Sequence, residues 1–185
     1  MSHRLAAALD PTGRAVGGLV RQACGLRKAE SHDNAPNRHR QKTYLDLLLL
    51  ADDDGRMLDR HLERGTMWVL EEDGLVRAEC VVTDEGDGVL EIKNLAVRPQ
   101  DQGRGYGRAV IEFLAYEYAA RFEVLQVGTG ESPLTLPFYE KCGFAFSHRI
   151  ANFFTDNYEH PIVEGGVLLK DMVVLRRRLS PSHIA

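Results

Sequence analysis

A glycine-rich stretch between two patterned runs is the feature that most restricts what this 185-residue chain can fold into. It reads Gln102-Gly103-Arg104-Gly105-Tyr106-Gly107, and it stands between a strand-like run and an amphipathic helical run. Glycine lets the backbone approach a bulky anion and adopt conformations that other residues avoid. The free amides at a helix N-terminus bind phosphate oxygens, and Arg104 and Arg108 add full positive charges. The stretch therefore predicts a diphosphate-binding turn, with an ordinary tight turn as the alternative.

The runs before this turn exclude the two common nucleotide-binding folds. Residues 66–71, 76–83 and 89–98 have strand character and are joined by short acidic turns, which predicts an antiparallel meander. A dinucleotide-binding fold places its glycines after the first strand of a parallel unit. A Walker loop needs Gly-Lys-Ser/Thr, where this chain has Arg108-Ala109.

The remaining patterns predict one α/β (α+β) domain with a mixed sheet. Residues 1–24 are interpreted as an N-terminal extension of unknown role and residues 25–185 as a single domain. Before the meander we expect a first strand, a polar loop and two helices broken near Asp54-Gly55, over residues 26–30, 31–42 and 42–64. After the glycine turn we expect a helix, a strand, a second helix and a closing pair of strands, over residues 105–122, 124–127, 133–142, 144–154 and 167–179.

Composition narrows the partners and the compartment. The net charge of −4 disfavours nucleic acid as a partner, because phosphate binding needs a basic surface. No apolar run is long enough to span a membrane. Three cysteines without paired spacing, and histidines without ligand spacing, argue against a disulfide framework and against a metal site. These features fit a reducing cytosol, so we expect a cytoplasmic protein.

Two motifs resemble the GNAT superfamily of acetyl-CoA-dependent N-acetyltransferases. Gln102, Gly105 and Gly107 match its Gln/Arg-x-x-Gly-x-Gly/Ala signature, and residues 95–99 are similar to the end of its fourth strand. Residues 138–144, Phe-Tyr-Glu-Lys-Cys-Gly-Phe, resemble its Tyr-x-x-x-Gly-Phe element. The closing region, with Asn152-Phe153-Phe154 and Tyr158, resembles a subgroup of small bacterial-type members with no settled acceptor.

The resemblance implies a mostly antiparallel central sheet of about six to seven strands flanked by helices, with acetyl-CoA as co-substrate and no metal. Main-chain groups near Leu95 and Val97, where the family's fourth strand splays from its neighbour, would help to stabilise the oxyanion. Family members often carry Asn where this chain has Ser132. The residues implied to bind the cofactor are Leu95, Ala96, Val97, Gln102, Gly103, Arg104, Gly105, Tyr106, Gly107, Arg108 and Ser132.

Two residues are predicted to be catalytic. The resemblance places Tyr139 beside the cofactor sulfur, where a phenol can donate a proton to the departing thiolate; the alternative is a packing aromatic at a helix end. Glu91 is the predicted base, at the start of the strand that leads to the turn, and the alternative is an exposed carboxylate beside Lys93. Glu79, on the preceding strand, is the reserve choice. Cys142 is interpreted as a small buried residue and not as a nucleophile.

The predicted function is transfer of an acetyl group to a primary amine of a small molecule, by direct attack in a ternary complex. The alternatives are a non-catalytic acetyl-CoA-binding regulatory module, a protein lysine or N-terminal acetyltransferase, and a transferase of longer acyl chains. Asp156, Glu159 and Glu164 are interpreted as a solvated surface or as a cation-binding rim. Edge strands permit a homodimer.

Overall fold

The computed structural model describes residues 25–29, 44–51 and 55–180 of the chain. The predicted extension of residues 1–24 and the predicted loop of residues 31–42 lie outside them. The first half contains β1 (Leu26–Lys28), α4 (Leu45–Ala51), α5 (Gly55–Arg64), β2 (Thr66–Glu72), β3 (Leu75–Asp84) and β4 (Val89–Val97). The second half contains α6 (Tyr106–Tyr118), β5 (Val124–Gly130), α7 (Leu136–Lys141), β6 (Ala145–Ile150), α8 (Phe153–Asn157), β7 (Val163–Glu164), β8 (Val167–Leu168) and β9 (Met172–Arg178).

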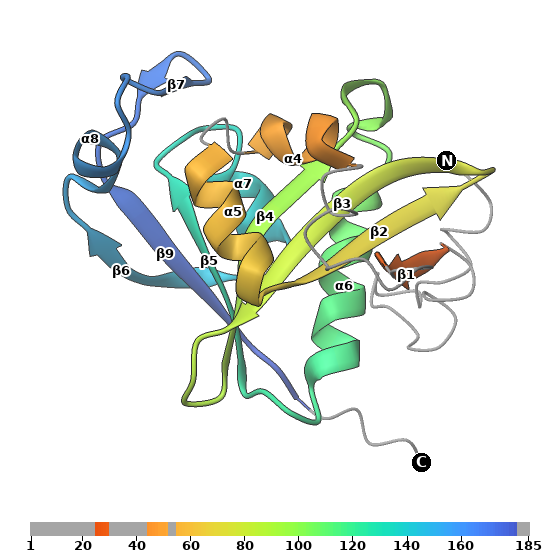
Figure 1. Cartoon of the computed structure of the whole chain (residues 1–185). Helices are drawn as coiled ribbons and strands as arrows, with labels where there is room; N and C mark the ends of the chain where they lie inside the picture. Colours follow the sequence, from red (N-terminus) through yellow and green to blue (C-terminus); the bar gives the residue numbers. More distant parts are fainter. Residues whose placement is uncertain (1–24, 30–43, 52–54, 181–185) are drawn as a thin grey trace.

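Seven strands form one sheet in the order β1-β2-β3-β4-β5-β9-β6, and β7 pairs with β8 in a separate hairpin (Figure 1). Every pair of neighbours in the large sheet is antiparallel except β4 and β5. The predicted meander corresponds to β2, β3 and β4. The mixed, mostly antiparallel sheet flanked by helices confirms the predicted fold class.

Helices cover both faces of this sheet (Figure 1). On one face, α6 and α7 pack on the larger core, whose strand residues include Trp68, Ile92 and Leu125. On the other face, α4 and α5 pack on a smaller core around Met67 and Val81. Both cores follow from the alternation of side chains along each strand, which sends successive residues to opposite faces.

Trp68 anchors the larger core and gives a stability prediction. Its ring is 1 % exposed, it packs edge-on against Phe113 at 4.7 Å, and its Nε1 donates a hydrogen bond to the Tyr118 hydroxyl at 3.1 Å. Trp68→Phe removes that hydrogen bond and leaves a cavity, so we expect a loss of about 2 kcal/mol in the free energy of unfolding. Urea denaturation monitored by circular dichroism measures it. A variant within about 0.5 kcal/mol of wild type would contradict this role.

The two parallel strands separate part-way along their length. The ladder joins Val89–Ile92 to Val124–Val127 and stops there, although β4 continues to Val97 and β5 to Gly130. A bulge accompanies the separation, because β3 pairs Val82 with Ile92 but Val81 with Asn94, which leaves Lys93 as an extra residue. Beyond Ile92 and Val127 the two strands are no longer paired with each other, and the glycine turn begins shortly after the separated end of β4.

The closing region differs in detail from the sequence prediction. The strand expected over residues 144–154 ends at Ile150, because Asn152 adopts a left-handed conformation (φ 58°) and α8 follows. The strand expected over residues 167–179 is divided into β8 and β9. The β7–β8 hairpin turns through Gly165 and Gly166, whose φ values of 59° and 81° suit a two-residue loop.

In the part of the chain that the structure describes, no helix is long and apolar enough to cross a membrane.

Candidate active site

The glycine turn connects the splayed end of β4 to the first turn of α6. Gly103 and Gly105 have φ values of 72° and 91°, and Gly105 is the N-cap of the helix. No side chain caps this terminus, so the amides of the first turn keep their capacity to bind an anion. The Gln102 side-chain amide donates to the Val97 carbonyl at 3.3 Å, which ties the turn to β4.

The buried carboxylate of Asp101 holds the glycine turn in place through two arginines. Asp101 is 1 % exposed and accepts hydrogen bonds from Arg77 at 3.1 Å and from Arg104 at 2.8 Å. The Arg104 guanidinium also lies over the Tyr106 ring, 5.6 Å from its centre. The Tyr106 hydroxyl donates a hydrogen bond to Glu72, which fixes this side chain against β2. Tyr106 is also the first residue of α6. The Arg108 side chain, one residue past Gly107, is exposed.

Gly107 allows the helix to lie close to its neighbours. A Cβ placed there would meet the Phe138 ring at 3.1 Å and the Val97 side chain at 3.5 Å. The lack of a side chain thus keeps the N-terminus of α6 close to both the end of β4 and α7. A positive helix terminus with uncapped amides, beside two separated strands, fits a long ligand that carries a diphosphate.

The predicted residues of β4 line the splayed segment. Leu95 and Val97 are half-buried and pack toward the larger core, and Ala96, 5 % exposed, pairs with Glu79 of β3. Because β5 no longer pairs with this segment, its β5-facing edge has main-chain groups that the parallel ladder does not use. Main-chain donors on that edge suit a ligand that carries amide or carbonyl groups.

Tyr139 lies on α7, where it packs edge-on against Phe138 and Phe144. Its side chain is 8 % exposed, and burial is the main cause that raises its pKa well above the usual range. Cys80, Cys142, Glu164 and Glu79 are near enough to raise it further. The phenol therefore stays protonated at neutral pH and acts as a hydrogen-bond donor. The structure gives it both a packing role and a buried hydroxyl.

Ser132 shapes the link between β5 and α7. It is 1 % exposed, and its hydroxyl accepts a hydrogen bond from the Leu134 main-chain amide at 3.1 Å. Its carbonyl accepts from the amide of Leu136, the first residue of α7. These bonds give Ser132 a local structural role at the start of α7, and its predicted contact with the cofactor stays a prediction.

Glu91 lies in the part of β4 that is still paired with β5. Its carboxylate accepts hydrogen bonds from Lys93 at 2.7 Å and from the Gln126 side-chain amide at 2.6 Å. Its side chain is 14 % exposed. Each carboxylate oxygen therefore has one hydrogen-bond partner and keeps a further lone pair.

Glu79, the reserve choice for the base, differs from Glu91 in its burial and in its hydrogen bonding. It is completely buried, and within the described part of the chain neither of its carboxyl oxygens has a hydrogen-bond partner of ordinary geometry. Burial raises its pKa to about 8, an effect that the nearby main-chain N–H of Ala96 only partly offsets. A carboxyl group in this state titrates near neutral pH, as general acids and bases often do.

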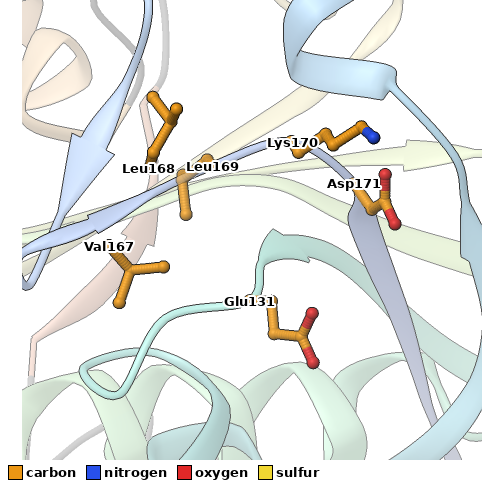
Figure 2. Close-up of a pocket in the computed structure, with 6 residues that line it drawn as sticks. All are labelled: Glu131, Val167, Leu168, Leu169, Lys170 and Asp171. Carbon is orange, nitrogen blue, oxygen red and sulfur yellow. The ribbon is translucent and has the colours of Figure 1, made fainter.

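The structure also contains a hollow that the sequence did not predict, between the end of β5 and the segment that joins β8 to β9. It has a volume of about 280 Å³ and is bounded by Glu131 and residues 167–171. Figure 2 shows apolar Val167 and Leu168 at one end and the carboxylates of Glu131 and Asp171 at the other. Arg149 of β6 contacts both carboxylates, at 2.6 and 3.5 Å, so its single positive charge compensates one of their two negative charges. Adjacent to the hollow, Glu164 of β7 accepts a hydrogen bond from Thr135 at 3.4 Å.

Among the described residues, no group of three or more His, Cys, Asp or Glu side chains is placed to hold a metal ion. Cys80 and Cys142 are free and buried, and burial raises the pKa of each thiol. Thiols in that state are poor nucleophiles, because the thiolate is the reactive form.

A splayed parallel strand pair followed by a glycine turn and a helix N-terminus defines a site for a ligand that carries a diphosphate, and comparison with known proteins gives the family. The family model of the acetyltransferase (GNAT) domain matches residues 63–145. The uncharacterized N-acetyltransferase YvbK of Bacillus subtilis is 35% identical over 136 residues, which are 70% of this chain and 85% of that protein. The chain belongs to the GNAT acetyltransferase family.

Solved structures agree with this membership. A GNAT family acetyltransferase from Elizabethkingia anophelis with acetyl-CoA bound is 29% identical, with a TM-score of 0.74, over 83% of this chain and 97% of that one. A Bacillus subtilis acetyltransferase in complex with CoA is 28% identical, with a TM-score of 0.72 and the same coverage. An IAA acetyltransferase from Bacillus cereus is 30% identical, with a TM-score of 0.72, over 83% of this chain and 98% of that one.

Proposed function

We propose that this protein transfers the acetyl group of acetyl-CoA to a primary amine of a small molecule, by direct attack within a ternary complex. The observation that carries the proposal is the separation of β4 from β5 directly before an uncapped helix N-terminus. Two solved relatives hold acetyl-CoA or CoA, which supports the same ligand here.

In this proposal, the turn of Gln102–Arg108 receives the diphosphate through the amides at the N-terminus of α6. The splayed segment Leu95–Val97 supplies main-chain donors to the pantetheine arm and to the oxyanion that forms during transfer. Acetyl-CoA supplies a thioester whose carbonyl carbon accepts the amine and whose sulfur leaves.

Tyr139 is proposed to donate a hydrogen bond to the sulfur as the carbon–sulfur bond breaks. Its raised pKa keeps the phenol protonated, so the donor is present throughout the neutral range. Glu91 remains the sequence-based prediction for the group that accepts the amine proton. A homodimer and a cytoplasmic location also remain predictions from the sequence.

The test is release of the CoA thiol, followed with a thiol-reactive dye, across a panel of primary amines, secondary amines and alcohols. We expect acetyl-CoA consumption that depends on a primary amine, with the acetylated amine identified by mass spectrometry. Acetyl-CoA binding without turnover on any acceptor, including peptides with free N-termini or lysines, would favour the regulatory-module alternative.

A further inference from the structure

Among the described residues, three buried acceptor atoms without a hydrogen-bond partner of ordinary geometry lie together on the face of the sheet that α4 covers. They are both carboxyl oxygens of Glu79 and Oδ1 of Asn94. Glu79 is 0 % exposed and Asn94 is 3 % exposed. Buried polar atoms nearly always have partners, so three unpartnered acceptors in one place indicate that a donor-rich ligand completes them.

The strand register brings these atoms together. Glu79 of β3 pairs with Ala96 of β4, and Val81 pairs with Asn94, so Glu79 and Asn94 are diagonal neighbours on one face. Diagonal neighbours on adjacent strands lie within reach of long side chains. The Asn94 amide nitrogen donates to the Leu48 carbonyl of α4 at 3.1 Å, which fixes its orientation and leaves Oδ1 as an acceptor.

This cluster lies at the reaction centre proposed above. Asn94 and Ala96 belong to the splayed part of β4, beyond the last parallel pair, Ile92 with Val127. Glu79 is also near enough to Tyr139 to raise the pKa of its hydroxyl. The unpartnered acceptors are therefore beside the splayed main chain of β4, and the electrostatic influence of Glu79 extends to Tyr139.

We infer that Glu79 and Asn94 form the receptor for the primary ammonium group of the acceptor, and that Glu79, not Glu91, takes its proton. The inference rests on the proposed function and specifies its acceptor as a cationic primary amine. An alkylammonium group carries three N–H donors, which matches the three acceptor atoms. Glu91 differs because each of its carboxylate oxygens already has one partner, Lys93 or Gln126.

The acid–base chemistry follows from the burial of Glu79. At pH 7 a carboxyl of pKa about 8 is about nine-tenths protonated, so binding of the ammonium cation displaces a proton to solvent. An alkylammonium has a pKa of about 10.4 and an ordinary glutamate about 4.3. The raised pKa of Glu79 therefore brings the pKa of the proton acceptor much closer to that of the donor than an ordinary glutamate would.

The proposed steps balance. The ammonium gives one proton to the Glu79 carboxylate, and the freed nitrogen lone pair attacks the thioester carbonyl carbon. The carbon–nitrogen bond forms, the carbon–sulfur bond breaks, and the sulfur leaves with its electron pair. The second N–H proton goes to that sulfur, beside Tyr139. The products are the amide and the CoA thiol, and Glu79 is again protonated.

The other titratable groups around Glu79 are not suited to accept the amine proton in its place. In the described part of the chain, its neighbours Cys80 and Tyr139 are buried groups whose pKa values are raised, so both stay neutral. On the opposing strands its partners are Val69 and Ala96. On α4, Asp46 forms an exposed ion pair with Arg98 at 3.0 Å. On the same sheet face, Lys93 binds Glu91 and Glu85, and the pKa of the α5 residue His61 is lowered to about 4, mainly by burial.

Entry of an ammonium group requires α4 to move away from the sheet. The contacts that hold this helix include the Asn94–Leu48 hydrogen bond and the exposed Arg98–Asp46 ion pair. Within α4, Leu47 and Leu48 are buried against the sheet, whereas Leu45, Leu49 and Leu50 are 40–53 % exposed. Local opening of a single short helix costs less free energy than unfolding of the whole domain.

The test is isothermal titration of the CoA-loaded protein at pH 7 with n-butylammonium, in two buffers of different ionisation enthalpy. We expect binding with release of most of one proton. Glu79→Gln should weaken binding by about 10- to 100-fold and abolish the proton release, since it removes a charged hydrogen-bond acceptor. Glu140→Gln, which alters an exposed carboxylate next to Tyr139, should retain both. Tetramethylammonium, which has no N–H donor, should not bind.

Several results would overturn this inference. These are n-butylammonium binding without proton release, equal binding by wild type and Glu79→Gln, and no binding by a protein that binds CoA. In the amine assay, kcat/KM of wild type should rise with pH to half its maximum near pH 8 and level off about one pH unit higher, and Glu79→Gln should lose this dependence. Loss of this dependence in Glu91→Gln alone would assign the proton to Glu91. Failure to bind CoA would instead reject the proposed function.

Discussion

Replacing Tyr139 with phenylalanine is expected to lower kcat about 100-fold while leaving the affinity for acetyl-CoA unchanged within about twofold. The ring contacts with Phe138 and Phe144 do not involve the hydroxyl, so the fold and the cofactor turn should be preserved. What is lost is one buried hydroxyl that stays protonated because burial raises its pKa. Steady-state thiol release and acetyl-CoA titration together measure the effect.

Tyr116→Phe is the matched control for this change. Tyr116 lies on α6 and is only half-buried, so loss of its hydroxyl should leave kcat near the wild-type value. Equal turnover by wild type and Tyr139→Phe would reduce Tyr139 to a packing residue. Absence of turnover in both, with acetyl-CoA still bound, would support a non-catalytic binding module.

Gly105→Val should weaken acetyl-CoA binding by about 100-fold. Gly105 has a φ of 91°, a conformation in which a β-branched residue is strained, and it stands at the helix terminus proposed to receive the diphosphate. Loss of charge-assisted hydrogen bonds from even one or two amides accounts for an effect of this size. Fluorescence or calorimetric titration with acetyl-CoA measures the dissociation constant.

Gly86→Val separates backbone strain from loss of the binding site. Gly86 has a φ of 82° in the turn between β3 and β4, and a Cβ there would meet nothing within 4 Å. Its cost in stability should be similar to that of Gly105→Val, with no change in acetyl-CoA affinity. Equal affinity losses in both variants would mean that the glycine turn acts only through stability.

The features that could be predicted from the sequence are those with local signals. The meander, the glycine turn and α6 follow from strand alternation, glycine spacing and helical periodicity, each of which is contained within a few residues. Gln102, Gly105 and Gly107 are predicted to bind the cofactor from their match to a family motif, and that role stays a prediction. The β7–β8 hairpin had a signal in Gly165-Gly166, but strands of two residues are too short for alternation to be recognised.

The features that could not be predicted depend on register between strands. Nothing in the sequence indicates that Lys93 is a bulged residue, or that Glu79 and Asn94 are diagonal neighbours. The alternative interpretation of Glu91 was an exposed carboxylate beside Lys93. In the structure Glu91 also accepts a hydrogen bond from Gln126, which lies on the neighbouring strand and has no signal in the local sequence. The ion pairs of Arg149 with Glu131 and Asp171 join three separate segments and have no local pattern.

The most direct test of the account is a thermal unfolding comparison of the protein alone and with acetyl-CoA, CoA or ATP. A ligand at 100 times its dissociation constant adds about 2.7 kcal/mol of stability, which corresponds to about 5–10 °C in a domain of this size. We expect such a rise in Tm with acetyl-CoA and with CoA, and none with ATP. No rise with either CoA species, or an equal rise with ATP, would contradict the assignment of the splayed strands and the glycine turn to acetyl-CoA.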